Sequence, residues 1–485
     1  MRSDSNTESH KALEDTITVV TTEIHHPPPG AAARSPGTAA LVALCIGCFM
    51  VTFDVSVVTV AIPRIGDDLD AGLTVLQWVV DGYTLVFAAL MLTAGSLGDR
   101  YSARTVFLCG LLIFGIGSLL CGLAPSGIAL VGFRFLQGVG AAAMIPSSLS
   151  LLRALYTDRA ARAHAFGVWS MVAGVAAATG PVLGGVFITF AGWRSVFLIN
   201  IPVVILAYWM TKRYVPAART TGDGGFGWLS QLLGTAAVAL LVIGLNEAGS
   251  LGWRHWLVLT CFILAALSCT AFALDQRRDE SVSLTDREFL AAAAVGLLFT
   301  LGFFGILFLT PIFFQRVQHF SPLTTGFAML PIALPAIFLA AAAGRLVGRI
   351  GPRSPAVVGL TAGSLSLLGW MLVDPGTNYA LPLALLVLGG VAPAFTLPAS
   401  TAAIMESVPP EQAGLGSAVF NTARQVGGAI GVAVAGSLTT STDAVRGLHL
   451  NAAAGAVITL LALALAITFF GGRSVSRAVG THRRR

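Results

Sequence analysis

Long runs of apolar residues, separated by short polar segments, recur along most of the chain. Most runs are close to the roughly 20 residues that a helix needs to cross the hydrocarbon core of a bilayer. The pattern therefore predicts an all-α integral membrane protein with fourteen transmembrane helices. The predicted spans cover residues 38–62, 77–97, 104–124, 127–151, 164–189, 196–212, 228–246, 255–274, 289–311, 325–344, 355–373, 380–405, 413–437 and 450–471.

The placement of Lys and Arg residues predicts the orientation of these spans. If the spans alternate in direction, most basic residues fall in the two tails and in the connections on one side. The connections on the other side hold only Arg64, Arg194, Arg254, Arg316 and Arg446. Because basic residues favour the cytoplasmic side, we expect a multi-pass protein of the plasma (inner) membrane with both termini in the cytoplasm. The same asymmetry explains the net charge of +6 without nucleic acid as a partner.

Composition narrows the class of protein further. Hydrophobic residues make up 55% of the chain and charged residues 11%, against about 25% charged residues in soluble domains. Residues 1–37 are polar and have no signal-peptide pattern, so we interpret them as a disordered cytoplasmic tail, and residues 472–485 as a basic one. The scarcity of lysine beside arginine is typical of a GC-rich, bacterial genome.

The sequence offers no catalytic or metal-binding constellation. Neither Lys11 nor Lys212 follows a glycine, which excludes a phosphate-binding loop of the Walker type. All cysteines lie in apolar runs, where no disulfide framework is expected. We therefore predict a protein that is neither an enzyme nor dependent on a bound cofactor.

Short blocks of similar sequence recur at an offset of about 250 residues. Residues 94–100 match residues 343–349, and blocks in the fourth and fifth spans match blocks in the twelfth and thirteenth. The repeat predicts two parallel six-helix halves, 38–213 and 288–471, with two inserted helices in 228–275. Transporters that move two such halves around a central site are built in this way.

Two ionisable residues fall at similar depth within predicted spans. Asp54 in the first span lies roughly 12 Å from the outer end of that span, at about 1.5 Å per residue. Arg134 in the fourth span lies roughly 10 Å from the outer end of its own span. Ionisable residues at membrane depth are rare and mark ion and proton pathways. We interpret the two as a proton-exchanging pair, with a static ion pair that positions two helices as the alternative.

A polar helix face and an aromatic stripe are candidates for a substrate cavity. Asn421, Arg424 and Gln425 share one face of the thirteenth span, where polar residues either face a cavity or hydrogen-bond to other helices. The ninth span carries four phenylalanines, including Phe303, which either pack against neighbours or line a pocket. We assign five residues to the substrate cavity, namely Gln137 of the fourth span, Phe303, Asn421, Arg424 and Gln425.

The fifth span contains Gly180, Pro181, Gly184 and Gly185. Proline removes a backbone hydrogen bond and bends a helix, whereas glycines allow close contact between helices. The pattern predicts a bend at a helix interface, which helix packing alone would also explain.

Several of these motifs, taken in order, resemble those of the major facilitator superfamily, and specifically its fourteen-span drug:proton antiporter branch. They are Gly95-x-Leu97-x-Asp99-Arg100 after the second span, Arg134-x-x-Gln137-Gly138-x-Gly140 in the fourth, Gly180-Pro181-x-x-Gly184-Gly185 in the fifth, and Asn421-x-x-Arg424-Gln425 in the thirteenth. Their order and spacing extend the resemblance over residues 38–471. One departure is Gly348, which stands in the second half where Asp99 stands in the first.

The resemblance implies proton-coupled efflux of drugs or secondary metabolites by alternating access, with the proton gradient as the energy source. Asp54 and Arg134 would be the proton-linked pair. The residues implied in gating and in the conformational switch are Gly95, Asp99, Arg100, Gly180, Pro181, Gly184 and Gly185.

We expect amphipathic or cationic small molecules as substrates, with protons and the lipid bilayer as the other partners, and a monomer as the functional unit. An exporter dedicated to one antibiotic or metabolite is the first alternative. A proton-linked uptake symporter is the second, although the fifth-span motif argues against it.

Overall fold

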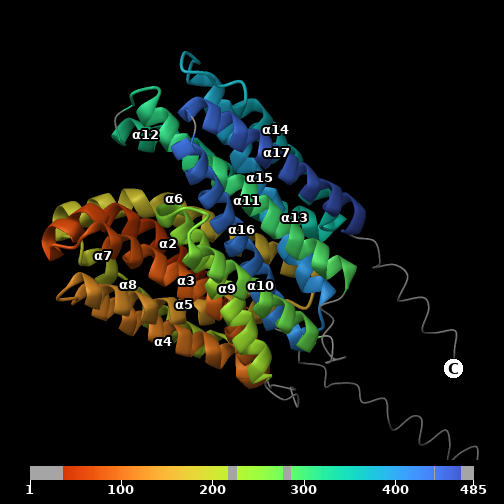
Figure 1. Ribbon diagram of the computed structural model, residues 1–485. Coiled ribbons are helices and arrows are strands. Elements are labelled where there is room, and N and C mark those ends of the chain that lie inside the picture. Colours follow the sequence, from red (N-terminus) through yellow and green to blue (C-terminus); the bar gives the residue numbers. More distant parts are fainter. Residues whose placement is uncertain (1–36, 217–226, 277–285, 321, 442, 471–485) are drawn as a thin grey trace, which may run out of the picture. The chain divides into compact units, whose positions relative to one another are not determined.

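The computed structural model describes residues 37–216, 227–276, 286–320, 322–441 and 443–470. The two predicted tails lie outside these residues, apart from Gly37. The first half contains α2 (Thr38–Leu69), α3 (Leu73–Leu97), η1 (Gly98–Ser102), α4 (Ala103–Gly122), α5 (Gly127–Leu155), α6 (Arg159–Ala191), α7 (Ser195–Leu198) and α8 (Asn200–Tyr214). The inserted pair is α9 (Trp228–Leu251) and α10 (Trp256–Gln276). The second half contains α11 (Arg287–Arg316), α12 (Pro322–Met329), η2 (Leu330–Ile332), α13 (Leu334–Ile350), α14 (Arg353–Trp370), α15 (Ala380–Ser407), η3 (Pro410–Gln412), α16 (Ala413–Ser441) and α17 (Ala444–Phe469) (Figure 1).

Every predicted span coincides with at least one of these helices. Within the described residues, nine helices are long and apolar enough to cross a membrane, and ten if the bent α6 is counted as one span. This number is below fourteen partly because α3, η1 and α4 run on without a break, so that residues 75–122 pass as a single segment of 48 residues. The chain is a multi-pass membrane protein.

Two helices that the predicted repeat equates, α5 and α15, have corresponding neighbours. α5 packs against α3 and α4 in the first half, and α15 packs against α13 and α14 in the second. Two copies of one six-helix arrangement would produce this correspondence.

The inserted helices join the two halves along one side. α9 packs against α10 and also contacts α3 of the first half and α16 of the second. The hydroxyl oxygens of Thr93 and Thr235 lie 3.0 Å apart, and Gln231 Nε2 donates a hydrogen bond to Ser96 Oγ at 2.9 Å. In Figure 1, α9 lies beside α3 and next to α10, and α9 covers the line along which α3 meets α16.

Local sequence determines where several helices begin and end. The side chains of Ser126 and Asp158 accept hydrogen bonds from backbone N–H groups in the first turns of α5 and α6, as N-cap residues commonly do. α6 and α13 are followed by Gly192 and Gly351, whose φ angles of 76° and 84° favour glycine.

Candidate functional site

A cluster of polar side chains lies in the interior of the first half. Asp54 on α2, and Arg134 and Gln137 on α5, expose at most 1% of their surface. Arg134 Nη1 donates hydrogen bonds to Asp54 Oδ2 and to Gln137 Oε1, the latter at 2.7 Å. Gln137 Nε2 donates to Asp54 Oδ1 at 2.8 Å. The structure therefore brings together the two residues that the sequence pairs by depth, and Gln137 bridges them.

Two residues from other helices complete the surroundings of the carboxylate. Asn200 Nδ2 on α8 donates to Ser118 Oγ on α4 at 2.9 Å, and to Asp54 Oδ1 at 3.4 Å. Ser118 and Asn200 are also almost fully buried. Sequence reasoning assigned neither to a site. The signal that could have found Asn200 is its position as an amide within the short apolar run of residues 196–212. Asp54, Ser118, Arg134, Gln137 and Asn200 are called the polar cluster below.

The guanidinium of Arg134 has partners on several sides. Its Nε donates to the Val79 carbonyl oxygen at 2.9 Å, and its central carbon lies 4.2 Å from the centre of the Tyr83 ring, within cation–π range. Together with Asp54 and Gln137, these groups surround an arginine that exposes 1% of its surface. A buried ion pair is tolerated only when its remaining donors and acceptors are satisfied in this way.

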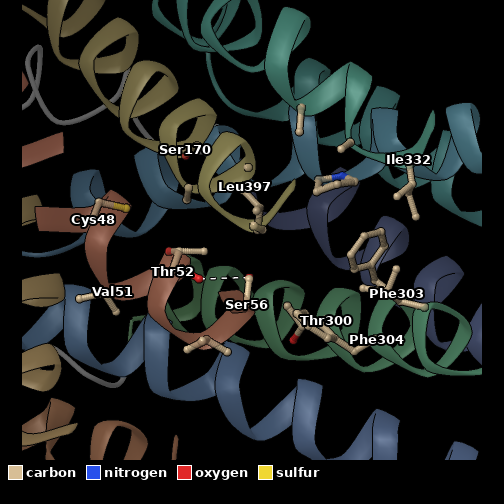
Figure 2. A pocket seen from close by; sticks show the side chains of 18 of the residues that line it. Cys48, Val51, Thr52, Ser56, Ser170, Thr300, Phe303, Phe304, Ile332 and Leu397 are labelled. Atoms are coloured by element: carbon tan, nitrogen blue, oxygen red, sulfur yellow. Dashed lines mark hydrogen bonds between the residues drawn. The ribbon is translucent and has the colours of Figure 1, made fainter. Parts of the chain in front are cut away.

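A cavity of about 1220 Å³ lies between the two halves. Small-molecule sites commonly occupy roughly 300–1,000 Å³, so this cavity is large enough for a drug-sized compound. Its wall is mostly apolar and aromatic. The residues labelled in Figure 2 show this mixture: Cys48, Val51, Thr52 and Ser56 on α2, Ser170 on α6, Thr300, Phe303 and Phe304 on α11, Ile332 on η2 and Leu397 on α15.

Helix α2 separates the cavity from the polar cluster. Thr52, Val55 and Ser56 line the cavity, whereas the Asp54 side chain bonds to Arg134 in the interior of the first half. Because successive residues are rotated by about 100° around an α-helix, Thr52 and Ser56 lie on the face of α2 opposite to Asp54. One helix thus carries the acidic residue on one face and part of the cavity wall on the other.

Four of the five residues assigned from sequence to the substrate cavity line it, namely Phe303, Asn421, Arg424 and Gln425. Gln137 does not belong to the described cavity wall. Its amide is fully buried and bonds to Asp54 and Ser118, so it is part of the polar cluster instead.

Arg424 reaches the cavity wall from α16. Thr300 Oγ1 on α11 donates to the Arg424 carbonyl oxygen at 2.9 Å. Glycine at 427 lets α16 approach α11, because a Cβ there would collide with the Leu297 carbonyl oxygen. Arg424 Nη1 donates to Asn421 Oδ1 at 3.3 Å, and Arg424 Nε is buried with no hydrogen-bond partner among the described residues.

At one end of the cavity, the connection between α3 and α4 meets the start of α16. Asp99 in η1 accepts hydrogen bonds from the backbone N–H groups of Gly414 at 2.7 Å and Leu415 at 2.8 Å. The first N–H groups of a helix have no partner within the helix and carry partial positive charge, so a carboxylate is well placed there. Gly95 permits this approach, because a Cβ at that position would collide with the Gly414 carbonyl oxygen.

Further contacts between the halves close the same end. The Arg159 guanidinium donates to both carboxylate oxygens of Glu406, at 3.0 Å and 3.1 Å. Arg153 Nη2 donates to the Val408 carbonyl oxygen at 2.7 Å. Arg100 lies 5.7 Å from the ring centre of the tyrosine that follows it. The end that carries Arg100, Arg153 and Arg159 is called the arginine-rich end below.

α6 and α13 are in close contact near the arginine-rich end. A Cβ added to Gly167 would lie 2.8 Å from the Gly344 Cα, and one added to Gly344 would lie 2.7 Å from the Gly167 Cα. The axis of α6 then turns by 47° between Arg159–Ala177 and Val182–Ala191. Beyond this bend Phe190 lines the cavity with 84% of its surface exposed. The cavity therefore extends towards the end opposite to the arginine-rich end.

The glycines of the fifth predicted span lie at this bend. A Cβ at Gly180 would collide with Ser56 of α2, and one at Gly184 would lie 2.8 Å from the side chain of the next residue of α2. Gly185 lines the cavity. The bend and the close helix contact expected from this segment, which includes Pro181, both occur here.

A large cavity between two groups of helices in a multi-pass membrane protein, closed at one end by contacts between those groups, defines a membrane transporter. The chain belongs to the Major Facilitator Superfamily, whose family model matches residues 44–432.

Similar proteins agree with this assignment. The chain is 34% identical over 409 residues to the methylenomycin A resistance protein of Bacillus subtilis (strain 168). This alignment covers 83% of this chain and 87% of that protein. It is 36% identical over 403 residues to the multidrug resistance protein Stp of Mycobacterium tuberculosis (strain CDC 1551 / Oshkosh), covering 82% and 75%. The fold is similar to that of the human organic anion transporter MFSD10 (TETRAN), with a TM-score of 0.66 and 13% identity over 88% of this chain and 99% of that one.

Proposed function

We propose that this protein is a proton-coupled exporter of drugs or secondary metabolites, with fourteen membrane spans and both termini in the cytoplasm of a bacterial cell. The observation that carries the proposal is the double role of α2, which lines the cavity on one face and holds the buried Asp54–Arg134 pair on the other. The names of the relatives at 34% and 36% identity, which are resistance proteins, support export. The monomer is the functional unit in this proposal, and the described cavity wall takes its residues from both halves of one chain.

In this proposal the arginine-rich end faces the cytoplasm, because Lys and Arg residues gather on the cytoplasmic side of membrane proteins. The cavity is then closed towards the cytoplasm and extends towards the outside. Asp99 at the start of α16 and the Arg159–Glu406 pair are the contacts that must separate before substrate can enter from the cytoplasm.

Protonation of Asp54 supplies the coupling step. A neutral carboxyl group no longer balances the charge of Arg134, so the hydrogen bonds that hold α2 against α5 weaken. Since Thr52 and Ser56 lie on the opposite face of α2, a shift of this helix also changes the cavity wall. Proton uptake from outside thereby favours substrate release, and proton loss to the cytoplasm resets the carrier. The proton gradient is the energy source, and no cofactor is required.

Reconstitution into liposomes with an imposed pH gradient tests this proposal. Uptake of anionic, neutral and cationic fluorescent probes is measured for the native protein, for Asp54→Asn and for Asp68→Asn. Asp68 is a matched control, since it lies on the same helix but pairs with Arg194 at an exposed position. We expect Asp54→Asn to lose gradient-driven transport, because an amide cannot take up and release the coupling proton, and Asp68→Asn to retain it.

Two outcomes would contradict the proposal at different points. Equal gradient-driven transport by Asp54→Asn and native protein would remove Asp54 from the coupling step. Transport by the native protein that ignores the pH gradient would overturn proton coupling itself.

A further inference from the structure

Arg424 is the one charged side chain among the described residues that line the cavity. The described part of the wall contains neither aspartate nor glutamate, and the described ion pairs of the chain join other residues. The cavity therefore presents a positive charge that no carboxylate of its own wall balances.

The hydrogen bonds of Arg424 also leave capacity for a ligand. Its guanidinium donates to the Asn421 side-chain oxygen at 3.3 Å, and its central carbon lies 5.7 Å from the centre of the Phe420 ring. Arg424 Nε is buried and has no partner among the described residues. A guanidinium carries five N–H donors in a planar fork that matches a carboxylate, and most of these donors are not satisfied by the protein contacts described here.

The backbone of Arg424 is held against α11, and its side chain packs there. Thr300 on α11 bonds to its backbone carbonyl at 2.9 Å. A Cβ built on Gly296 of α11 would lie 3.3 Å from the Arg424 Cγ, so the side chain packs against the α11 backbone. Preorganised donors bind a ligand with less loss of conformational entropy than mobile donors.

The remainder of the wall suits an apolar ring system. The Phe299 and Phe303 rings stack at 5.6 Å, and Phe304 meets Phe303 edge-to-face at 5.7 Å. All three line the cavity. Ser170 on α6 adds a hydroxyl group that is buried without a hydrogen-bond partner among the described residues. The cavity thus combines an aromatic surface from α11 with a cation from α16.

We propose that the cavity selects amphipathic organic anions, and that Arg424 binds their anionic group, a carboxylate in the simplest case. This inference rests on the proposed export function and narrows its substrate class from amphipathic or cationic compounds to anionic ones. A cationic compound would find no carboxylate on the described wall and would be repelled by Arg424, whereas an anion supplies the charge that the wall lacks.

Binding of three probes with the same ring system tests this proposal: pyrenebutyrate, the neutral pyrenebutanol, and a pyrenylbutyl-trimethylammonium salt. Their affinities for the purified full-length protein are measured by equilibrium dialysis, which requires no transport. We expect the carboxylate to bind about 10–100-fold more tightly than the neutral probe, the range for charge-assisted hydrogen bonds. Arg424→Gln should abolish this preference by weakening the binding of pyrenebutyrate, and Arg424→Lys should retain part of it.

Two further variants secure the interpretation. Gln425→Ala changes the neighbouring cavity residue without changing the charge, and we expect it to keep the preference for the carboxylate. If Arg424→Gln fails to fold, Ser170→Asp adds a carboxylate to the same cavity while Arg424 is retained, and we expect it to weaken pyrenebutyrate binding. Equal affinity for all three probes, tighter binding of the cation, or a preference that persists in Arg424→Gln would overturn the proposal.

Transport of the same probes separates this inference from the proposed function. Gradient-driven export of the cationic probe alone would leave the exporter intact and overturn anion selection. Arg424-dependent binding of pyrenebutyrate without gradient-driven transport would retain the anion site and overturn proton-coupled export.

Discussion

Two arginines at membrane depth have opposite surroundings. Arg134 exposes 1% of its surface, and a carboxylate, an amide, a backbone carbonyl and an aromatic ring surround its guanidinium. Arg424 lies on a cavity wall with one amide oxygen at 3.3 Å and one aromatic ring nearby, and its Nε has no partner among the described residues. The difference supports two purposes for the same residue type in one bundle. The protein pairs Arg134 with a carboxylate, and in our proposal Arg424 is left for a ligand.

The physical cost of a charge in a low-dielectric interior explains why this difference is informative. An ionised group that is removed from water must be paired and hydrogen-bonded, or it destabilises the fold. The polar cluster meets that requirement internally, so its energy depends on the protonation of Asp54. Arg424 meets the requirement only in part from the protein, so it depends on whatever enters the cavity.

The largest expected effect on stability comes from a change in the polar cluster. Asp54→Ala leaves Arg134 buried without its counter-charge, and breaking a buried pair in this way costs about 3–5 kcal/mol. We expect a large fall in the melting temperature of the detergent-solubilised protein, measured by its intrinsic fluorescence.

The double variant Asp54→Ala/Arg134→Leu sharpens this test. Removing both charges together should be much less damaging than the sum of the two single changes, because no unpaired charge remains. Additive losses would show that the two residues do not compensate each other.

A substitution at the edge of the polar cluster should have a smaller effect on stability. Asn200→Ala removes the donor to Ser118 Oγ at 2.9 Å and a long contact to Asp54. Loss of one partner of a buried polar group costs about 1–3 kcal/mol, so the melting temperature should fall less than in Asp54→Ala. Ser170→Ala is the matched control, since its hydroxyl group has no partner to lose among the described residues. A loss in Ser170→Ala as large as that in Asn200→Ala would contradict the distinction between the two regions.

Much of this comparison could be predicted from the sequence, and the reasons for the exceptions are physical. Helical periodicity places Asn421, Arg424 and Gln425 on one face, and all three line the cavity. Depth within the bilayer predicts that Asp54 and Arg134 can meet, and they do. Periodicity does not tell which neighbour covers a face, so Gln137 was assigned to the cavity although Asp54 and Ser118 hold it in the polar cluster.

Contacts between segments far apart in the sequence were the hardest to predict. The family resemblance implies a gating role for Asp99, but its partners, the first N–H groups of α16, lie more than 300 residues away along the chain. Which helix start reaches this loop depends on the packing of the two halves, and local sequence carries no signal for it. Asn200 joins the polar cluster for the same reason, since its position is set by how α8 packs on α4.

The smallest expected effect on stability is at Arg424. Arg424→Met removes a charge that has no carboxylate partner on the described wall and keeps a long side chain against α11. Replacing a poorly compensated charge with an apolar side chain of similar length is often neutral or stabilising, so we expect the melting temperature of the free protein to stay the same or rise.

The Arg424→Met change should instead remove the stabilisation by ligand. A ligand that binds the folded state stabilises it by about 2.7 kcal/mol at a concentration 100 times its Kd, so saturating pyrenebutyrate should raise the melting temperature of the native protein and have little effect on Arg424→Met. A melting temperature of free Arg424→Met that falls as far as that of Asp54→Ala would mean that the protein already compensates Arg424, and the contrast between the two arginines would fail.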